Sequence, residues 1–240
     1  MSRTVVVTGG ARGIGLAVVN RFTALGDRVI ALGRDRRALA AVDGIVCDVT
    51  DEAAVSATFE RIGDVDVLVN NAGIGESAPL SKTTLAAWRR HLEVNATGAF
   101  LCMRAVVPGM RARGRGAIVT VASTAGRQGV PYTSAYTASK HAAVGLTRAV
   151  AAEVAGTGVT VNAVCPTFVD TEMTQRTIDN IVQRTGRTPE ESARALTDST
   201  ALGRLLDPDE VADAVVFLAS PQAATINGQA LVVDGGGIQA

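Results

Sequence analysis

The chain has 240 residues, 47% of them hydrophobic and only 3% aromatic, so it is long enough to bury a large aliphatic core and is not a disordered polymer. Its 23 basic and 23 acidic residues cancel, which gives no indication of a nucleic-acid-binding surface or of a surface for acidic membranes. Cys47, Cys102 and Cys165 stand singly in apolar runs, with no CxxC pair or Cys/His cluster, so neither a metal site nor a disulfide framework is expected.

Segments typical of strands and of helices alternate along the chain. The first segment is rich in β-branched residues, as in a strand that is buried on both faces. Strands are predicted at Arg3–Thr8, Arg28–Leu32, Gly44–Cys47, Asp66–Asn70, Gly116–Ala122, Thr160–Val164 and Gln229–Val233. Helices are predicted at Ile14–Leu25, Asp35–Ala41, Asp51–Arg61, Thr84–Arg111, Ser134–Ala155 and Asp209–Ala219, and the polar stretch Thr171–Thr200 is predicted to be helical in pieces.

This alternation predicts right-handed βαβ units and a seven-stranded parallel sheet with helices on both faces. No linker, charge run or internal repeat divides the chain, so residues 1–240 are predicted to form a single doubly wound, Rossmann-type α/β domain. Ligands of such a sheet bind beyond the carboxyl ends of its strands, and the residues that follow each strand are therefore the candidates for function.

The N-terminal residues lead directly into the first strand, without the apolar core of a signal peptide. No apolar run approaches the ~18 residues that a transmembrane helix needs. We therefore expect a cytoplasmic protein whose cysteines stay reduced and which has no membrane partner.

A glycine-rich turn follows the first strand and opens the first helix. Glycines allow a sharp turn and let backbone N–H groups approach a pyrophosphate, to which the helix N-terminus adds partial positive charge. A tight turn that only packs a helix would look similar, but the position at the start of a βαβ unit favours a dinucleotide site. The turn reads Thr8-Gly9-Gly10-Ala11-Arg12-Gly13-Ile14-Gly15.

A second candidate site lies at the start of the helix predicted from Ser134. Tyr136 and Lys140 are four residues apart, so both side chains project from one helix face. A cation beside a tyrosine stabilises the phenolate, which makes the pair a candidate acid/base device. Each residue alone would be an ordinary aromatic or a solvated charge.

The spacing T-G-x-x-x-G-x-G, together with Tyr136-x-x-x-Lys140, resembles the short-chain dehydrogenase/reductase family, and the resemblance covers almost the whole chain. It implies a nicotinamide dinucleotide seated by Gly9, Arg12, Gly13, Ile14 and Gly15. It also implies contacts from Asp48 and Val49 to the adenine, and further contacts from Asn71, Ala72 and Gly73 after the fourth strand. The remaining implied cofactor contacts are Tyr136, Lys140, Pro166, Val169 and Thr171, with Thr167 standing where the family usually has glycine.

The end of the second strand bears on the choice of cofactor. An acidic side chain there accepts from the ribose of NAD, whereas basic side chains bind the 2′-phosphate of NADP. By the spacing of the family that the chain resembles, Gly33 holds the position that is acidic in NAD enzymes, and Arg34 and Arg12 are two guanidiniums suited to a phosphate. This pattern favours NADP(H), while NAD(H) remains the alternative if Asp35 accepts from the ribose and the arginines are solvated.

The resemblance also implies the reaction. Nicotinamide transfers a hydride to a carbonyl carbon, and the carbonyl oxygen needs a proton donor. Tyr136 is the implied acid, with its pKa lowered by Lys140 and the oxidised ring, and Ser123 is expected to hold the substrate oxygen. Asn95 is the implied anchor of a water that links Lys140 to solvent. We expect His91, His141 and Trp88 to be structural.

The expected substrate is a small carbonyl or hydroxyacyl compound, with CoA or an acyl carrier protein as a candidate carrier. The stretches Val121–Val130, Ala138–His141 and Val161–Pro166 resemble aromatic-polyketide ketoreductases and 3-oxoacyl-thioester reductases. The segment from Glu172 to Leu205 resembles the lid of 3-hydroxybutyrate and hydroxyacyl-CoA dehydrogenases, and four arginines in it are candidates for contact with phosphates: Arg176, Arg184, Arg187 and Arg194.

Reversible, NADP(H)-dependent reduction of a 3-oxoacyl thioester is the favoured function. The alternatives are an NAD-dependent 3-hydroxyacyl-CoA or 3-hydroxybutyrate-type dehydrogenase, a polyketide ketoreductase, and, in another class, a non-catalytic dinucleotide-sensing scaffold. An extended sugar-nucleotide epimerase is disfavoured because its usual turn and extra substrate domain are missing. The resemblance also implies a homotetramer that packs through the long helices Thr84–Arg111 and Ser134–Ala155.

Overall fold

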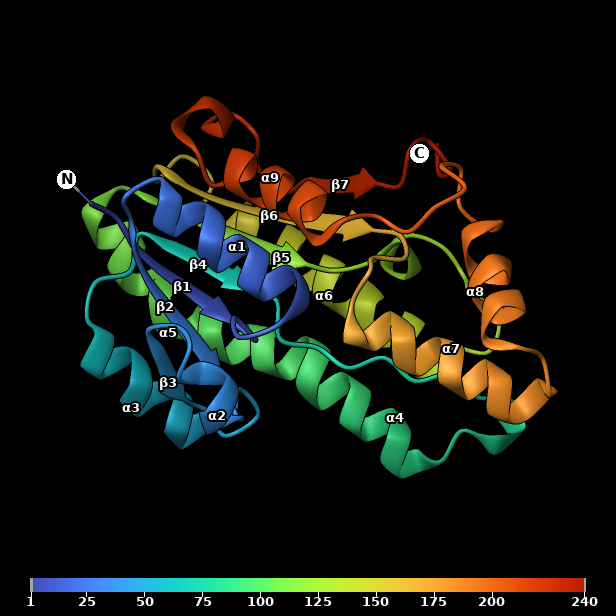
Figure 1. The fold of residues 1–240 in the computed structure, drawn as a ribbon. Helices are drawn as coiled ribbons and strands as arrows, with labels where there is room; N and C mark the ends of the chain where they lie inside the picture. The colour runs from blue at the N-terminus through green and yellow to red at the C-terminus, as the bar shows by residue number, and fades with distance from the viewer. Residues whose placement is uncertain (1, 240) are drawn as a thin grey trace.

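The computed structural model describes Ser2 to Gln239, which form one parallel sheet with helices on both faces (Figure 1). The seven strands lie in the order β3-β2-β1-β4-β5-β6-β7. This confirms the predicted Rossmann-type, doubly wound, single-domain architecture. The strands are β1 Thr4–Thr8, β2 Arg28–Gly33, β3 Gly44–Val46, β4 Val67–Asn70, β5 Gly116–Val121, β6 Val159–Pro166 and β7 Ala230–Val233.

Helices α1 and α9 cover one face of the sheet, and α3, α5 and α6 cover the other (Figure 1). The α-helices are α1 Gly13–Ala24, α2 Arg36–Leu39, α3 Glu52–Ile62, α4 Leu85–Leu92, α5 Gly98–Arg113, α6 Ser134–Glu153, α7 Glu172–Thr185, α8 Pro189–Thr197 and α9 Pro208–Leu218. Four short elements complete the chain: η1 Leu80–Lys82, η2 Glu93–Thr97, η3 Thr124–Gly126 and η4 Pro221–Ala223.

The core is aliphatic on both sides of the sheet. Along β1, Val5 and Val7 pack with α1 and α9, whereas Val6 points to the opposite cluster, since successive side chains of a strand alternate between faces. Both faces are buried, which explains why the strand sequence is a continuous apolar run. The three cysteines are buried as expected, and Cys47 and Cys102 belong to the same cluster.

The strand order reverses between β1 and β4, which are neighbours in the sheet although separated in sequence. The turn after β1 and the segment after β4 therefore lie side by side at the carboxyl edge of the sheet. This switch point is where a doubly wound sheet binds its ligand.

The predicted long helix from Thr84 to Arg111 differs in one respect. Thr84 caps the start of α4, but the π turn η2, Glu93–Thr97, separates α4 from α5. A π turn is wider than an α-helical turn, so one side chain points away from the face that regular helical spacing would give it. Such turns are often found at functional sites. The residue at the centre of η2 is Asn95, which is 3% exposed.

Helices α7 and α8 project beyond the end of the sheet as a pair, and α7 lies across from α4 (Figure 1). Thr171 caps α7, and a reciprocal capping box between Thr188 and Glu191 begins α8. A backbone bridge between Val169 and Leu206 closes the base of the pair. The prediction that this stretch is helical in pieces is confirmed. Within residues 2–239, no helix is long and apolar enough to cross a bilayer.

Candidate active site

The glycine-rich turn is shaped by close backbone contacts. Gly9 and Gly13 have φ angles of 65° and 48°, in the left-handed region that favours glycine. A β-carbon at Gly15 would lie 2.2 Å from the carbonyl oxygen of Gly9, so no side chain fits there. Because these positions carry no side chain, the N-terminus of α1, which includes Ile14, packs directly against the loop.

Thr8 and Asn71 hold this turn against the segment after β4. The buried Thr8 hydroxyl accepts from the backbone N–H groups of Asn71 and Ala72 at 2.9 and 3.0 Å. The Asn71 amide donates to the carbonyl oxygens of Thr8 and Gly9 at 2.9 and 3.2 Å. The Asn71 side chain thus supports the turn from behind, and it does not line the neighbouring cavity.

The first cavity, of about 280 Å³, lies between the turn, the end of β2 and the residue pair Asp48–Val49. Arg12, Gly33 and Arg34 all line it. Arg12 pairs with Asp35 and, at 3.3 Å, with Glu172, and the Arg34 guanidinium lies 3.7 Å from the Asp48 carboxylate. The remaining lining residues among those predicted to bind the cofactor are Gly9, Val49, Ala72 and Gly73.

Asp48 is anchored to the adjacent Thr50, whose N–H and hydroxyl both donate to it, at 3.0 and 2.8 Å. Partial burial raises the pKa of this carboxyl, but the bonds from Thr50 and the charge of Arg34 outweigh burial, so its pKa lies below the usual value. Asp48 is therefore a fixed negative charge at the edge of the first cavity.

These features fit a dinucleotide. The turn offers backbone N–H groups and a helix N-terminus for a pyrophosphate, and β-carbons at the glycines would fill the cradle. The loop after β6 closes on the same turn, since Thr171 Cγ2 lies 3.1 Å from where a Gly13 β-carbon would stand. Pro166 ends β6, and Thr167 has no left-handed φ, so its replacement of glycine does not strain the loop.

Tyr136 and Lys140 lie on the first two turns of α6, as predicted, and the Lys140 Nζ is 5.8 Å from the centre of the Tyr136 ring. Lys140 is 5% exposed, and its ammonium donates to the backbone carbonyl of Val121 at 2.9 Å. Burial lowers the pKa of Lys140 to about 8, because the charged form loses its hydration. Keeping Lys140 charged in the folded protein therefore costs free energy.

Ser123 follows β5 and is 9% exposed. Its side chain lowers the pKa of Tyr136, but burial of the phenol has the larger effect, so the pKa of Tyr136 is raised. The expectation that Lys140 lowers the pKa of Tyr136 is therefore not met in this structure, since removal of water around the phenol dominates. A raised pKa keeps Tyr136 protonated near neutrality, the form that donates a proton.

Asn95 connects the π turn to both sides of the site. Its Oδ1 accepts from the N–H of Ile74 at 2.8 Å, and its Nδ2 donates to the Ile74 carbonyl at 2.9 Å and to the Ser139 hydroxyl at 2.8 Å. Ser139 in turn donates to the carbonyl of Tyr136. The Asn95 side chain thus ties the loop after β4 to the helix that carries Tyr136 and Lys140.

A second cavity, of about 510 Å³, lies between α4, α7 and the loop before α6. Gly73 and Ile74 line both cavities, and a β-carbon on Gly73 would lie 3.5 Å from the Lys140 Nζ. A β-carbon on Gly75 would lie 3.4 Å from the Tyr136 ring. The phenol and the ammonium therefore lie beside the segment at which the two cavities meet.

The three residues predicted to be structural, His91, His141 and Trp88, differ in their burial. His91 is buried, its Nδ1 donates to the Ala87 carbonyl and its Nε2 accepts from the N–H of Glu76 at 3.1 Å, which requires the neutral ring. Its ring also meets Tyr136 edge to face, with centroids 6.4 Å apart. His141 and Trp88 are exposed. His91 is thus a structural histidine that also packs against the phenol.

Several site residues are not evident from the sequence. Thr8 belongs to the quoted motif, yet nothing in one sequence shows that its hydroxyl accepts two N–H groups. Ser139 adjoins Lys140 and has no sequence signal of its own. Tyr132 has a φ of 65°, alone among the non-glycine residues of 2–239, and it lines the second cavity at 68% exposure. The signal that could have pointed to Tyr132 is its position in the loop V-P-Y-T-S, which directly precedes the helix that carries Tyr136.

Comparison with known proteins decides the family. Residues 9–237 match the sequence profile of a family described as "Enoyl-(Acyl carrier protein) reductase". The chain is 41% identical, over 96% of its length and 91% of the relative's, to the granaticin polyketide synthase putative ketoacyl reductase 1 of Streptomyces violaceoruber. The chain belongs to the short-chain dehydrogenase/reductase family. It is an oxidoreductase that acts on alcohol or ketone groups, as the whole set of motifs indicated.

Members of this family with different substrates match this chain about equally well. The 2-(R)-hydroxypropyl-CoM dehydrogenase of Xanthobacter autotrophicus is 41% identical over 98% of both chains. The crystal structure of a variant of actinorhodin polyketide ketoreductase with NADPH has a TM-score of 0.91 and 40% identity, with 98% of this chain and 97% of that one covered. Among residues 2–239, no three His, Cys, Asp or Glu side chains gather as a metal site requires.

Proposed function

We propose that this short-chain dehydrogenase/reductase interconverts a ketone and a secondary alcohol with NADP(H), and that its substrate is a 3-oxoacyl thioester. The observation that carries the reaction is the position of Tyr136, beside Ser123 and one helical turn from Lys140, at the junction of the two cavities. The first cavity takes the cofactor and the second takes the substrate.

When it is bound, the nicotinamide supplies the hydride. Tyr136 donates the proton to the carbonyl oxygen, and burial suits it to this role by keeping the phenol protonated. Ser123 donates to the same oxygen and holds it beside the phenol. Lys140 binds the nicotinamide ribose and stabilises the phenolate that forms, and Asn95 positions Lys140 through Ser139 and the loop at Ile74.

The preference for NADP(H) is supported by the surroundings of Gly33. Arg12 and Arg34 border the first cavity and are about half exposed or more, so both guanidiniums are accessible to a 2′-phosphate. The rival acceptor, Asp35, is already engaged: it caps α2 by accepting from the N–H groups of Arg37 and Ala38, and it pairs with Arg12. A carboxylate used in this way is a poor partner for a ribose hydroxyl.

The proposed substrate rests on the relatives and on the second cavity. Proteins named as ketoacyl reductases are similar to the chain over nearly its whole length. We propose that the segment from Glu172 to Leu205 is a lid, because its helix α7 forms one wall of the second cavity and is joined to the loop after β4 by the Asn180 amide, which donates to the Ser77 hydroxyl.

Loss of NADPH absorbance with the N-acetylcysteamine thioester of acetoacetate tests this proposal, with NADH in parallel. The expected result is reduction with NADPH favoured by at least about tenfold in kcat/KM, and a loss of that preference in Arg34→Gln. The crotonyl thioester tests reduction of a carbon–carbon double bond, which the family's description raises. Turnover of crotonyl but not acetoacetyl thioester, or a preference for NADH, would overturn the corresponding part of the proposal.

A further inference from the structure

Helix α7 presents a stripe of side chains to the second cavity. Its cavity-lining residues recur every three or four positions, as one face of a helix requires. The sequence predicts that Arg187 and Arg194, like Arg176 and Arg184, contact phosphates. Neither Arg187 nor Arg194 lines the cavity. The stripe consists of Met173, Arg176, Thr177, Asn180 and Arg184.

The two ends of the stripe differ in chemistry. Met173 lies at the reacting end, because its sulfur and the Tyr136 ring both lie within 3.4 Å of where a Gly75 β-carbon would stand. Arg184 lies eleven residues further along α7, which is about 16 Å at the rise of an α-helix. The cavity therefore runs from an apolar end beside the phenol to a cationic end.

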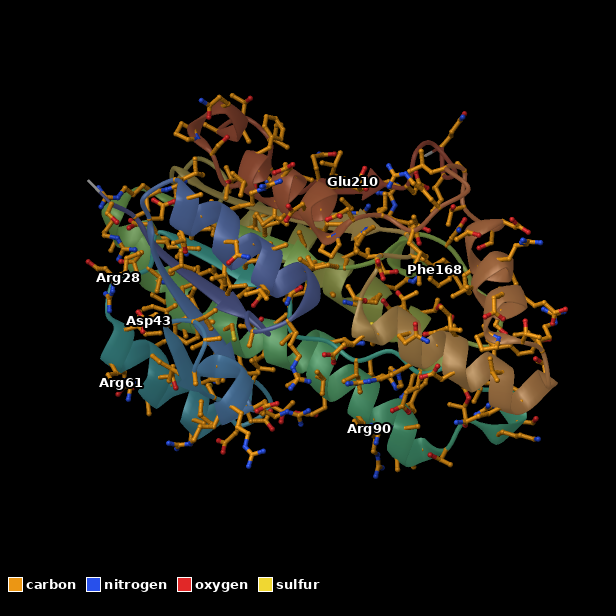
Figure 2. The ribbon with its side chains drawn as sticks, viewed as in Figure 1. Arg28, Asp43, Arg61, Arg90, Phe168 and Glu210 are labelled. Carbon is orange, nitrogen blue, oxygen red and sulfur yellow. The ribbon has the colours of Figure 1, made fainter. Side chains whose placement is uncertain are left out.

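The second cavity carries positive charge that the protein does not neutralise. The cavity is lined by four cations and one carboxylate, Glu76. Arg90, labelled on α4 in Figure 2, binds both oxygens of Glu76, and Arg176 pairs with Glu172 at 3.2 Å. Within residues 2–239, neither Lys82 nor Arg184 has a carboxylate at ion-pair distance, although the whole chain has no net charge.

Arg184 is also held in position. Its Nε donates to the Asn180 Oδ1 at 2.7 Å, and the Asn180 Nδ2 donates to the Ser77 hydroxyl at 2.9 Å. This chain of bonds fixes the guanidinium to the loop after β4 and leaves its two terminal nitrogens free of hydrogen bonds to residues 2–239. A guanidinium with two free terminal nitrogens is suited to bidentate binding of a phosphate.

We propose that Lys82 and Arg184 bind the phosphate of a phosphopantetheine-linked substrate. This inference rests on the proposed function, since it places the phosphate relative to the reacting carbonyl. An extended phosphopantetheine has about thirteen bonds between sulfur and phosphorus, or about 16 Å, and the 3-oxo carbon lies three bonds beyond the sulfur, so the arm is long enough to extend along α7 from Met173 to Arg184. A short-chain anionic ketone held at Tyr136 would not reach this end.

Calorimetry measures the phosphate site without catalysis. 4′-Phosphopantetheine and pantetheine differ only in the phosphate, and saturation with NADP⁺ keeps both from the cofactor site. We expect the wild-type protein to bind the phosphorylated form at least about fivefold more tightly. The double variant Lys82→Gln/Arg184→Gln should lose this difference, and Arg187→Gln, an exposed change outside the cavity, should keep it. Equal binding of both compounds by the wild-type protein would overturn the proposal.

Kinetics separates this proposal from the proposed function. The double variant should raise the KM for acetoacetyl-CoA about tenfold, leave kcat unchanged, and leave kcat/KM for the neutral N-acetylcysteamine thioester unchanged. Acetoacetyl-acyl carrier protein in place of acetoacetyl-CoA shows which carrier supplies the group. If the protein reduces neither thioester, the proposed function is wrong, and the calorimetry still decides whether the phosphate site exists. If the double variant impairs both thioesters equally, the phosphate site is refuted.

Discussion

Asn95 and Ile74 form a reciprocal amide pair: the Asn95 side chain accepts from the N–H of Ile74 and donates to its carbonyl, at 2.8 and 2.9 Å. The pair has the geometry of a backbone hydrogen-bond ladder, yet one partner is a side chain in a π turn. It holds the segment that separates the two cavities, and the same amide reaches Ser139 on α6. One side chain thus ties the segment that lines both cavities to the helix that carries Tyr136 and Lys140.

Replacing Asn95 with aspartate tests this relationship. The carboxylate cannot donate to Ile74 or Ser139, and it is buried beside a carbonyl, so we expect a loss of about 2–4 kcal/mol in the free energy of unfolding. We also expect a fall of at least about tenfold in kcat. Urea denaturation and initial rates measure the two effects.

Asn162→Asp is the matched control, because Asn162 is equally buried and also bonds two backbone groups, but lies outside the site. It should lose stability and keep kcat; unchanged kcat in Asn95→Asp would contradict the role.

Tyr136→Phe removes the proposed proton donor and keeps the ring that packs against His91. We expect kcat for ketone reduction to fall by about 10²–10⁴, which is the usual contribution of a positioned acid. Binding of NADPH, followed by fluorescence titration, should be little changed. Ser123→Ala should have a smaller effect of about 10–100-fold, since one donor to the carbonyl oxygen is lost. Retention of wild-type kcat in Tyr136→Phe would rule out the mechanism.

Lys140 predicts an unusual dependence of stability on pH. Below about pH 8 the lysine is charged in both states, and the folded protein carries the full cost of burying the charge. Between pH 8 and 10.5 the unfolded chain binds the proton and the folded protein does not, so this residue makes the free energy of unfolding rise with pH. The fall in pKa from 10.5 to about 8 corresponds to about 3 kcal/mol in total.

Urea denaturation of wild type and Lys140→Met at pH 7, 8, 9 and 10 measures this term. The difference in stability between them should shift by about 2–3 kcal/mol in favour of the wild type as pH rises. A difference that stays constant over this range would show that the pKa of Lys140 is not lowered. Activity of Lys140→Met should be lost at every pH.

Two glycine substitutions test the cofactor turn. Gly15→Ala places a β-carbon 2.2 Å from the Gly9 carbonyl oxygen, so the turn must move and NADPH affinity should fall by at least about tenfold. Gly145→Ala is the control: it lies in α6 with nothing within 4 Å of the added carbon. It should raise stability by about 0.5–1 kcal/mol and leave cofactor affinity unchanged. Equal affinity in both variants would show that the turn tolerates the added carbon.

Much of the fold and part of the site could be predicted because their causes are local. The continuous apolar strands, the caps at Thr84 and Asp51, and the glycines of the turn each depend on neighbours in sequence. The pairing of Tyr136 with Lys140 follows from helix geometry alone. The π turn could not be predicted, because Asn95 is drawn out of the regular helix by Ile74, which comes from another segment.

The raised pKa of Tyr136 also depends on distant parts of the chain. The sequence pointed to Lys140 as the neighbour that lowers it, but the extent of burial is set by the elements packed around the phenol, and burial dominates. Which of the four arginines between Glu172 and Leu205 line the second cavity also depends on distant parts of the chain. Only the position of α7, across the second cavity from α4, decides that Arg176 and Arg184 line the cavity while Arg187 and Arg194 do not.

The sequence by itself determined the alternation of strands and helices, the family, the glycine-rich turn and the candidate pair Tyr136 and Lys140, because each depends on residue types at short spacing. The tertiary structure alone decided how Thr8 and Asn71 brace the turn, and that Lys82 and Arg184, two cations without a carboxylate partner among residues 2–239, line one cavity. These features join segments far apart in sequence, and only packing brings such groups within hydrogen-bonding or electrostatic range.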